Sequence, residues 1–255
     1  NHIPYTTDAY LGLSTDAIGK SYLILTYQNT FINAPELNGV QFALVAAQDN
    51  TKVTIYPSTD VCGHVANVPF DLTLMKGQTY QLRNTNDSPA DLSGTIVVAD
   101  QPIAVFGSHQ SASIPAGGFF FCDYIVEQLF PTDLWGTSFV TSPLRTRAGG
   151  DTFRFLALFT NTSISIADAS GVRPSLTVNR AQFAEVQLSN ASVIIASQPI
   201  LVAQYANSAD FDLVDNADPS MILVPPITLF ASSYIVQTPT NGFGSNYLNI
   251  VAPSA

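Results

Sequence analysis

The segment IVVADQPIAVFGSHQ, residues 96–110, recurs in altered form as VIIASQPILVAQYAN, residues 193–207. Each copy consists of an apolar run, a Gln-Pro pair and a second apolar run. Proline cannot donate to a β ladder and holds the preceding residue extended, so each segment is expected to divide into two strands at this pair. We interpret Gln101-Pro102 and Gln198-Pro199 as scaffold turns whose glutamine amides satisfy backbone groups at a buried corner, rather than as ligand contacts.

Two further sets of matching segments surround these strands. The first set is STDAIGKSYLIL from Ser14, PTDLWGTSFVTSP from Pro131 and PITLFASSYIVQTP from Pro226; the second is FALVAAQDNTKVTI from Phe42, FRFLALFTNTSISI from Phe153 and YLNIVAPSA from Tyr247. Sequences that recur in the same order are typical of a repeat architecture. They predict one repeat unit over residues 1–120, a second over 121–217 and a partial third over 218–255, packed as one compact assembly.

The segments between these anchors have the periodicity of strands. In TKVTIY, Val53 and Ile55 share one face of the segment, as in a half-buried strand, whereas TIVVA, IAVF, SVIIA and ILVA are apolar on both faces, as in central strands of a covered sheet. Asn50 and Asn161 occupy matching positions between two strand-like runs, where asparagine tolerates the positive φ of a hairpin turn. The sequence therefore predicts an all-β fold, a pseudo-threefold repeat of β-sandwich-like units with the third truncated. A β-propeller-like arrangement is the alternative.

Charge and composition exclude several classes of partner. Hydrophobic residues make up 46% of the chain, charged residues make up 11%, and the net charge is −10. The acidic balance repels nucleic acid and anionic lipid, and no stretch reaches the roughly 20 apolar residues that cross a bilayer. Asn1 does not begin a signal peptide, so the chain is expected to be a mature fragment or an excised domain. A surface of amides and hydroxyls is expected, as in secreted or cell-surface proteins.

Cysteines and glycosylation motifs predict the same compartment. Cys62 and Cys122 lie in no Cys-x-x-Cys motif and beside no histidine at metal-ligand spacing, which favours a disulfide between them; two buried free thiols are the alternative. Asn86, Asn161 and Asn190 each begin an Asn-x-Ser triplet, the acceptor for N-linked glycans. The sequence thus predicts an extracellular glycoprotein with one disulfide.

Several phrases together resemble a known family. YTTDAYLGLSTDAIGKSYLILTY, FALVAAQDNTKVTIYP, LTLMKGQTYQL, LSGTIVVADQPIAVFGSHQSASIP and CDYIVEQLFPTDLWGTSFV follow one another as in the N-terminal domain of the IgGFc-binding protein family, found in animal mucus proteins and bacterial surface proteins. The resemblance implies an extracellular binding or adhesive module without enzymatic activity. It does not carry immunoglobulin binding to any residue of this chain.

One acidic segment is a candidate metal site. In NSADFDLVDNADPS, the hard oxygen ligands of Asp210, Asp212, Asp215 and Asp218 crowd together in a way that could hold Ca²⁺. The segment is not an EF-hand loop, because it lacks the glycine of the sharp turn and the closing glutamate. The alternative is a solvated acidic loop in which the aspartates serve turn chemistry.

Two other groups of side chains are candidate sites near the end of the first unit. His109 is followed by Asp123 and Glu127, a set that could bind a metal or move a proton, although the structural interpretation is favoured because no catalytic motif surrounds it. The phrase AGGFFFC places Phe119–Phe121 beside two glycines. On a strand, at least one of these rings would point away from the core, whereas burial between neighbouring units would hide all of them.

We predict a non-enzymatic extracellular structural or adhesive module that binds glycoprotein, glycan or copies of itself. Self-association through strand complementation, with the chain as a filament subunit, follows from the unpaired strands of a partial third unit. The first alternative is a secreted carbohydrate-active enzyme, with Asp123 and Glu127 or Asp151 as the carboxylates. The second alternative is a calcium-dependent, lectin-like binder. No other cofactor is expected.

Overall fold

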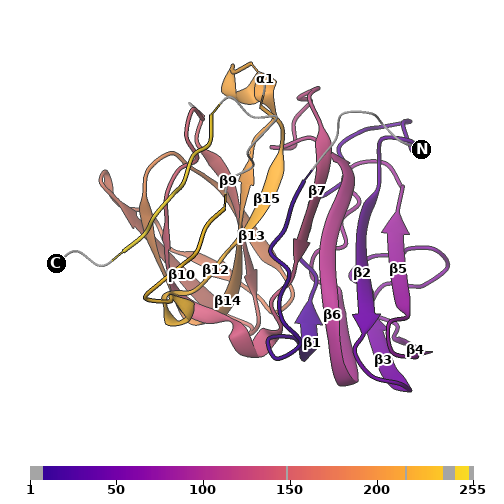
Figure 1. Ribbon diagram of the computed structural model, residues 1–255. Coiled ribbons are helices and arrows are strands. Elements are labelled where there is room, and N and C mark those ends of the chain that lie inside the picture. Colours follow the sequence, from indigo (N-terminus) through magenta and orange to yellow (C-terminus); the bar gives the residue numbers. More distant parts are fainter. Residues whose placement is uncertain (1–7, 148, 216, 238–244, 253–255) are drawn as a thin grey trace.

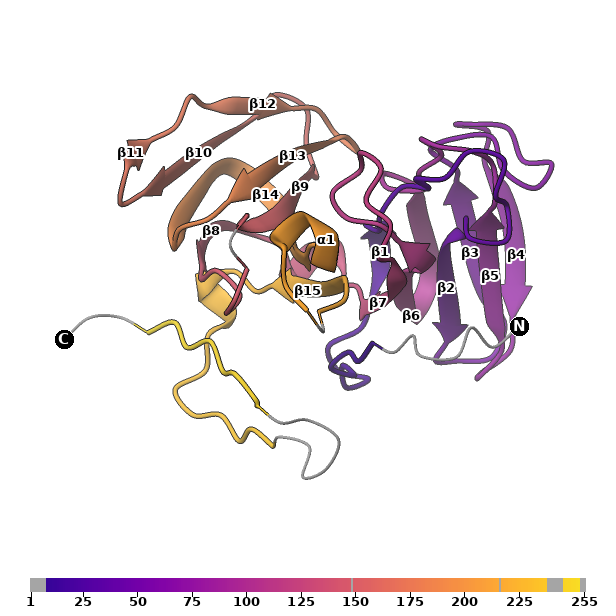
Figure 2. The ribbon, with the colours of Figure 1, turned by 90° about the horizontal axis from the view of Figure 1, so that it is seen from above.

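The chain folds into two β-sheets that lie side by side (Figures 1 and 2). The computed structural model describes residues 8–147, 149–215, 217–237 and 245–252. The first sheet has seven strands and the second has eight. Within the described residues, no helix is long and apolar enough to span a membrane.

The first sheet contains β1 (Gly19–Leu23), β2 (Val40–Ala46), β3 (Thr51–Tyr56), β4 (Phe70–Leu74), β5 (Thr79–Asn84), β6 (Ile96–Ala112) and β7 (Asp123–Gln128). The second sheet contains β8 (Gly136–Thr141), β9 (Asp151–Ala157), β10 (Thr162–Asp168), β11 (Gly171–Val172), β12 (Leu176–Val178), β13 (Phe183–Leu188), β14 (Ser192–Ala206) and β15 (Ser220–Val224). Three short helical turns complete the described elements, namely η1 (Thr132–Leu134), α1 (Ala209–Asp212) and η2 (Ile227–Leu229).

Each sheet is organised around one long strand. The first part of β6 pairs with β1 and β3, and its second part pairs with β2 and β7. In the same way, β14 pairs first with β8 and β10 and then with β9 and β15. One continuous strand therefore serves two sets of neighbours, and the sheet curls into a sandwich-like unit. The all-β class and the repeated sandwich-like units are confirmed.

The predicted division at the Gln-Pro pairs is wrong, because β6 and β14 run through them without interruption. Each pair instead marks a change of partner. The β1 ladder shifts register between Gly19 and Ser21 and the β8 ladder between Ile195 and Ile200, while the carbonyls of Pro102 and Pro199 accept hydrogen bonds from the Ala47 and Leu158 amides. Proline has no N–H to donate, but its carbonyl still accepts a hydrogen bond and so connects the long strand to the adjacent segment at this point. Gln101 is half-buried and Gln198 is exposed, so this corner is less enclosed than expected.

The elements of the two units follow one another in the same order, from β1 to η1 in the first and from β8 to η2 in the second, except that β11 and α1 occur in the second unit alone among the described residues. The hairpin prediction is confirmed, because Asn50 and Asn161 have φ values of 57° and 58°. The joins also match: a Cβ atom on Gly19 would collide with Pro131, and one on Gly136 would collide with Pro226. The sheets divide the chain later than the sequence repeat does. β7 and β15, which fall at the start of the second and third predicted units, complete the sheets of the units before them.

One hydrophobic core spans both units. It combines residues of the first sheet with Leu156, Leu201 and Leu223 of the second, and a smaller core fills the interior of the second unit. The prediction of burial on both faces holds for the later half of β14, holds in part for the later half of β6, where Ala104 and Phe106 are half-buried, and is wrong for both earlier halves. Val98, Val193 and Ile195 are 42–49% exposed, because no layer covers that face of either sheet within the described residues.

Candidate functional site

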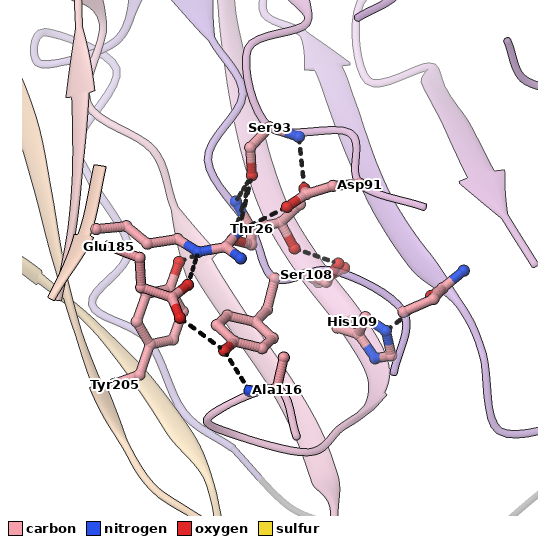
Figure 3. Close-up of polar contacts among 11 residues, drawn as sticks. Thr26, Asp91, Ser93, Ser108, His109, Ala116, Glu185 and Tyr205 are labelled. Carbon is pink, nitrogen blue, oxygen red and sulfur yellow. Dashed lines mark hydrogen bonds and ion pairs between the residues drawn. The ribbon is translucent and has the colours of Figure 1, made fainter. Parts of the chain in front are cut away.

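A buried arginine joins the two units. Arg154 lies on β9, at the position where the first unit has Ala43, and its side chain is fully buried. Its guanidinium forms ion pairs with Asp91 of the first unit at 2.7 Å and with Glu185 of the second at 2.8 Å. It also donates to the backbone carbonyl of Thr26 at 2.8 Å. Figure 3 shows these contacts converging from both units.

Aromatic rings enclose the same guanidinium. The rings of Tyr27 and Phe183 lie on it, each with its centroid 4.2 Å from the guanidinium carbon. The hydroxyl of Tyr205 donates to the carbonyl of Thr26, which also accepts from Arg154. The hydroxyl of Tyr27 donates to Glu185 and accepts from the Ala116 amide (Figure 3). Paired charges and cation–π contacts offset the cost of burying this ion, so the cluster holds the two units in one arrangement.

The backbones of the two units also approach each other closely at Gly94. Gly94 has a φ of 88°, and a Cβ atom placed on it would collide with the backbone carbonyl of Ala181 in the second unit. Glycine is therefore needed here for two reasons, its left-handed backbone and the approach of the other unit. Together with the Arg154 cluster, this contact makes the junction a fixed structural element.

The carboxylate of Glu127 lies on β7 at the other side of the junction. Burial, and then the nearby carboxylate of Asp8, raise the pKa of Glu127 to about 8, although the Leu223 amide donates to it and lowers the pKa. Burial also raises the pKa of Asp8, whose carboxylate accepts from the Val126 amide at 2.9 Å. The two carboxyl groups thus lie near each other in a partly buried site, and this environment favours the protonated form of Glu127.

We expect this site to make stability depend on pH. The folded pKa of Glu127 lies above the unfolded value of 4.5, so its contribution is complete below pH 4.5 and is lost as the pH rises through 8. Glu127→Gln, which imitates the protonated acid, is expected to raise the free energy of unfolding by about 2 kcal/mol at pH 9 and to change it little at pH 5. Urea titrations at both pH values measure this difference. Glu36→Gln, at an exposed position, is the control, and an equal effect of Glu127→Gln at both pH values would contradict the assignment.

His109 is a structural residue. It is fully buried on β6; its Nδ1 accepts from the Ser111 amide, so the other ring nitrogen donates to the side-chain oxygen of Asn29 at 2.9 Å. Burial, with the positive charges of Arg83 and Arg154, lowers its pKa to about 3. The neutral ring is therefore held in one tautomer. The structure does not bring His109, Asp123 and Glu127 together as a metal site, and none of the described residues forms a group of three or more metal ligands.

Asp151, a candidate carboxylate for hydrolysis, is also part of the scaffold. One of its oxygens accepts from the Leu144 amide at 2.8 Å and from the side chain of Gln204 at 2.7 Å. Burial raises its pKa. Asp123 is buried as well and accepts from the Tyr124 amide. Both carboxylates are thus buried and accept hydrogen bonds from backbone amides of the protein.

The side chains of the four aspartates of the acidic segment do not form one ligand cluster. Asp212 is buried against Arg147 with an N–O distance of 3.1 Å, and the backbone carbonyl of Asp218 accepts from the same guanidinium. Asp210 accepts from the Phe120 amide at 2.8 Å. Asp215 lies exposed in the loop after α1. The positive charge that organises this segment is therefore Arg147, and calcium binding stays a prediction without a formed ligand cluster.

The predicted disulfide is not formed. Cys62 is an exposed free thiol at a tight turn, where it donates to the carbonyl of Arg83. Cys122 is a half-buried free thiol that accepts from the hydroxyl of Ser111 at 2.8 Å. Spacing alone could not reveal that the two cysteines belong to different loops. The sequon residues Asn86, Asn161 and Asn190 are all exposed, as a glycan acceptor must be.

Two loops at one end of the molecule present apolar side chains to solvent. We call residues 113–122 and 207–213 the apical loops; α1, in the second of them, lies at the top of Figure 1. The first loop exposes Phe120 by 76% and Phe121 by 53%, and the second exposes Leu213 by 90%. The interpretation of Phe119–Phe121 as buried is therefore wrong for Phe120 and Phe121, whereas Phe119 is half-buried; the three residues lie in a loop and not on the strand that the alternative assumed.

The apical loops are held in place by many contacts. The Ile114 amide donates to the hydroxyl of Ser208 at 3.0 Å, and the Ser208 amide donates to the carbonyl of Ile114 at 2.6 Å. The ring of Phe119 packs edge-on against Phe211, with centroids 5.0 Å apart. The Ala116 amide is fixed by Tyr27 of the junction cluster. The exposed rings thus stand on a loop whose backbone is already ordered, which is the property of a preformed binding surface.

The sequence of the chain matches a known protein family. A family model described as IgGFc binding protein matches residues 8–255. The chain belongs to the IgGFc-binding family. IgGFc-binding protein of Homo sapiens is 27% identical to it over 240 residues, a match that covers 93% of this chain and 4% of the human protein. This chain therefore spans a small fraction of that relative's length.

Among solved structures, the crystal structure of Bacteroides uniformis β-glucuronidase matches at 14% identity, covering 89% of this chain and 28% of that one. Its TM-score of 0.16 is too low to bear on fold or function. The resemblance to the IgGFc-binding family that the sequence phrases indicate is thus confirmed by the family match and by the human relative.

Sequence reasoning missed the residue that organises this member of the IgGFc-binding family. Arg154 stands in FRFLALF, where every other residue is apolar. A charged residue in a strand predicted to be buried, at a position where the first repeat has Ala43, is the signal that could have identified it. Its partners could not be identified in this way, because Asp91 is 63 residues distant in the sequence.

Proposed function

We propose that this member of the IgGFc-binding family is a non-enzymatic extracellular module that binds a protein partner through its apical loops. The observation that carries the proposal is the exposure of Phe120 and Phe121 on an anchored loop. Membership of a family named for binding the Fc part of immunoglobulin G supports a protein ligand. The exposed sequon residues support an extracellular location.

Binding through these loops is favoured because it buries apolar surface and costs little conformational entropy. Exposed phenylalanines lose apolar contact with water when a partner covers them, and such aromatic residues often dominate the energy of an interface. A loop that is already fixed loses little conformational entropy on binding. The acidic and polar residues around the rings would form the rim, so the partner is expected to present an apolar patch with few negative charges.

The buried carboxylates support a non-enzymatic role. Asp123 and Asp151 lie inside the sheet and accept hydrogen bonds from neighbouring backbone amides. Glycoside hydrolysis needs two carboxyl groups that flank a bound sugar. The apical surface is therefore favoured over these carboxylates. Glycan binding through it would appear in the experiment below as binding that is lost when the glycans are removed.

We expect the variant Phe120→Ser/Phe121→Ser to bind at least tenfold more weakly than the wild type. The probes are the Fc fragment of immunoglobulin G and a mucin-type glycoprotein, with and without its glycans, measured by surface plasmon resonance. Phe159→Ser is the matched control, since Phe159 is 48% exposed on the turn between β9 and β10, at the opposite end of β9. Equal binding by the two variants, or no binding of either probe by the wild type, would overturn the proposal.

A further inference from the structure

The third copy of the repeat lies outside both sheets. Residues 230–237 and 245–252 carry the third-copy sequences ASSYIVQ and YLNIV, yet these described residues form no strand. In Figure 2 this segment, in yellow, projects outward from the second unit, below β8 and β15 in that view. Its apolar side chains are exposed, in order Tyr234, Ile235, Val236, Tyr247, Leu248 and Ile250.

The first two copies show what makes these sequences into strands. The first motif forms β1 and β8, and each of these pairs with the long strand of its own unit, β6 or β14. The second motif forms β2 and β9, which also pair with β6 and β14. Among the described residues, wherever the first motif forms a strand, that strand therefore pairs with a long strand that has a central Gln-Pro pair.

The first of the two third-copy segments shares one local hydrogen bond with its counterpart in the first unit. In the first unit, the Gly19 amide donates to the hydroxyl of Tyr22 at 2.8 Å, and that hydroxyl donates to the carbonyl of Ile103, the residue after Gln101-Pro102. In the third copy, the Ala231 amide donates to the hydroxyl of Tyr234 at 2.7 Å. The tyrosine hydroxyl is thus set to donate to an incoming strand at the same place, directly after its proline.

The second segment contacts the second unit at the place where β9 contacts the first, although the residue that aligns with Arg154 is Leu248 and not Asn249. Arg154 of β9 donates to the carbonyl of Thr26, and Asn249 donates to the carbonyl of Pro143 at 3.3 Å. Thr26 and Pro143 are equivalent, since each lies five residues after the matching serines Ser21 and Ser138. A cleft of about 480 Å³ separates Tyr247–Asn249 from the ends of β8 and β15.

We propose that residues 232–236 and 247–251 form an acceptor for one extended strand from outside residues 1–255. The strand has the pattern of β6 and β14, namely two apolar runs joined by Gln-Pro. Its first half pairs with residues 232–236 as β8 pairs with β14, and its second half pairs with residues 247–251 as β9 does. Pairing satisfies the backbone groups and covers the exposed apolar side chains of both segments.

A peptide with the sequence of β14, SVIIASQPILVAQYA, flanked by lysines for solubility, tests the proposal on the 255-residue chain. We expect binding by fluorescence anisotropy, with amide hydrogen exchange at residues 232–236 and 247–251 slowed at least tenfold and exchange in β6 and β14 unchanged. A peptide with the same composition in scrambled order is expected to bind at least tenfold more weakly. Slowed exchange in β6 or β14 instead, or equal binding of the scrambled peptide, would overturn the proposal.

Two further measurements extend the test, and the second of them does not depend on the peptide's solubility. Tyr234→Phe removes the hydroxyl that meets the incoming strand and is expected to weaken peptide binding about fivefold to tenfold, whereas Tyr56→Phe, at an exposed tyrosine of β3, is expected to leave it unchanged. The same β14 sequence joined to the chain by a Gly/Ser linker is expected to give the same protection without added peptide. A homodimer that protects both segments and excludes the peptide would contradict the proposed occupant.

Discussion

Replacing Arg154 with methionine is expected to lower the free energy of unfolding by about 3–5 kcal/mol, the largest effect of any single substitution considered for this chain. Methionine keeps much of the side-chain volume but leaves Asp91 and Glu185 without the charge that neutralises them at the junction. It also removes the cation between Tyr27 and Phe183. Guanidinium chloride titration measures the change.

The control and the compensating variant isolate the ion pairs. Arg180→Met changes the same residue type at an exposed position between β12 and β13, so stability should stay close to that of the wild type. The triple variant Arg154→Met/Asp91→Asn/Glu185→Gln is expected to recover part of the loss, since it removes the unpaired charges. If Arg154→Met were no more destabilising than Arg180→Met, the guanidinium would have no structural role at the junction.

Gly94→Ala is expected to destabilise the chain by about 2–4 kcal/mol. About 1–2 kcal/mol comes from the left-handed backbone, and the remainder from the collision of the new Cβ atom with the Ala181 carbonyl of the other unit. Gly77→Ala separates the two causes: Gly77 has a similar φ of 78°, but a Cβ atom there meets nothing within 4 Å.

Thermal unfolding of the two alanine variants gives the comparison. Gly77→Ala should cost about 1 kcal/mol, so the difference between the variants reports the close approach of the units alone. Equal losses would mean that the units can separate at Gly94 without a penalty, contrary to the junction described above.

The repeated phrases were sufficient to predict the all-β class and the sandwich-like units, because strand periodicity and turn chemistry are local properties. Asn50 and Asn161 illustrate this, since each adopts the left-handed backbone that its position in the hairpin indicates. The continuity of β6 through Gln101-Pro102 was not predictable in the same way. It depends on a change of ladder partner at the proline, and sequence periodicity carries no information on partners.

The candidate site was predictable only in part. The exposure of Phe120 follows from the shape of a loop fixed by Ser208 and Asp210, residues far away in the sequence. The disulfide prediction failed for a related reason, because the thiols of Cys62 and Cys122 belong to separate loops. Composition favoured a pair of cysteines but could not place them in space.

The contacts of Arg154 also impose an order on biosynthesis. All strands of the first sheet have been synthesised once Gln128 has been added, but Asp91 and Thr26 then lack the guanidinium that arrives later with β9. One flank of the nascent first unit, including Tyr27 and Leu92, stays open to water and to chaperones until the second unit has been translated. The first unit therefore cannot complete its packing until the second unit has been translated. Premature termination of translation between the two units would leave an aggregation-prone intermediate.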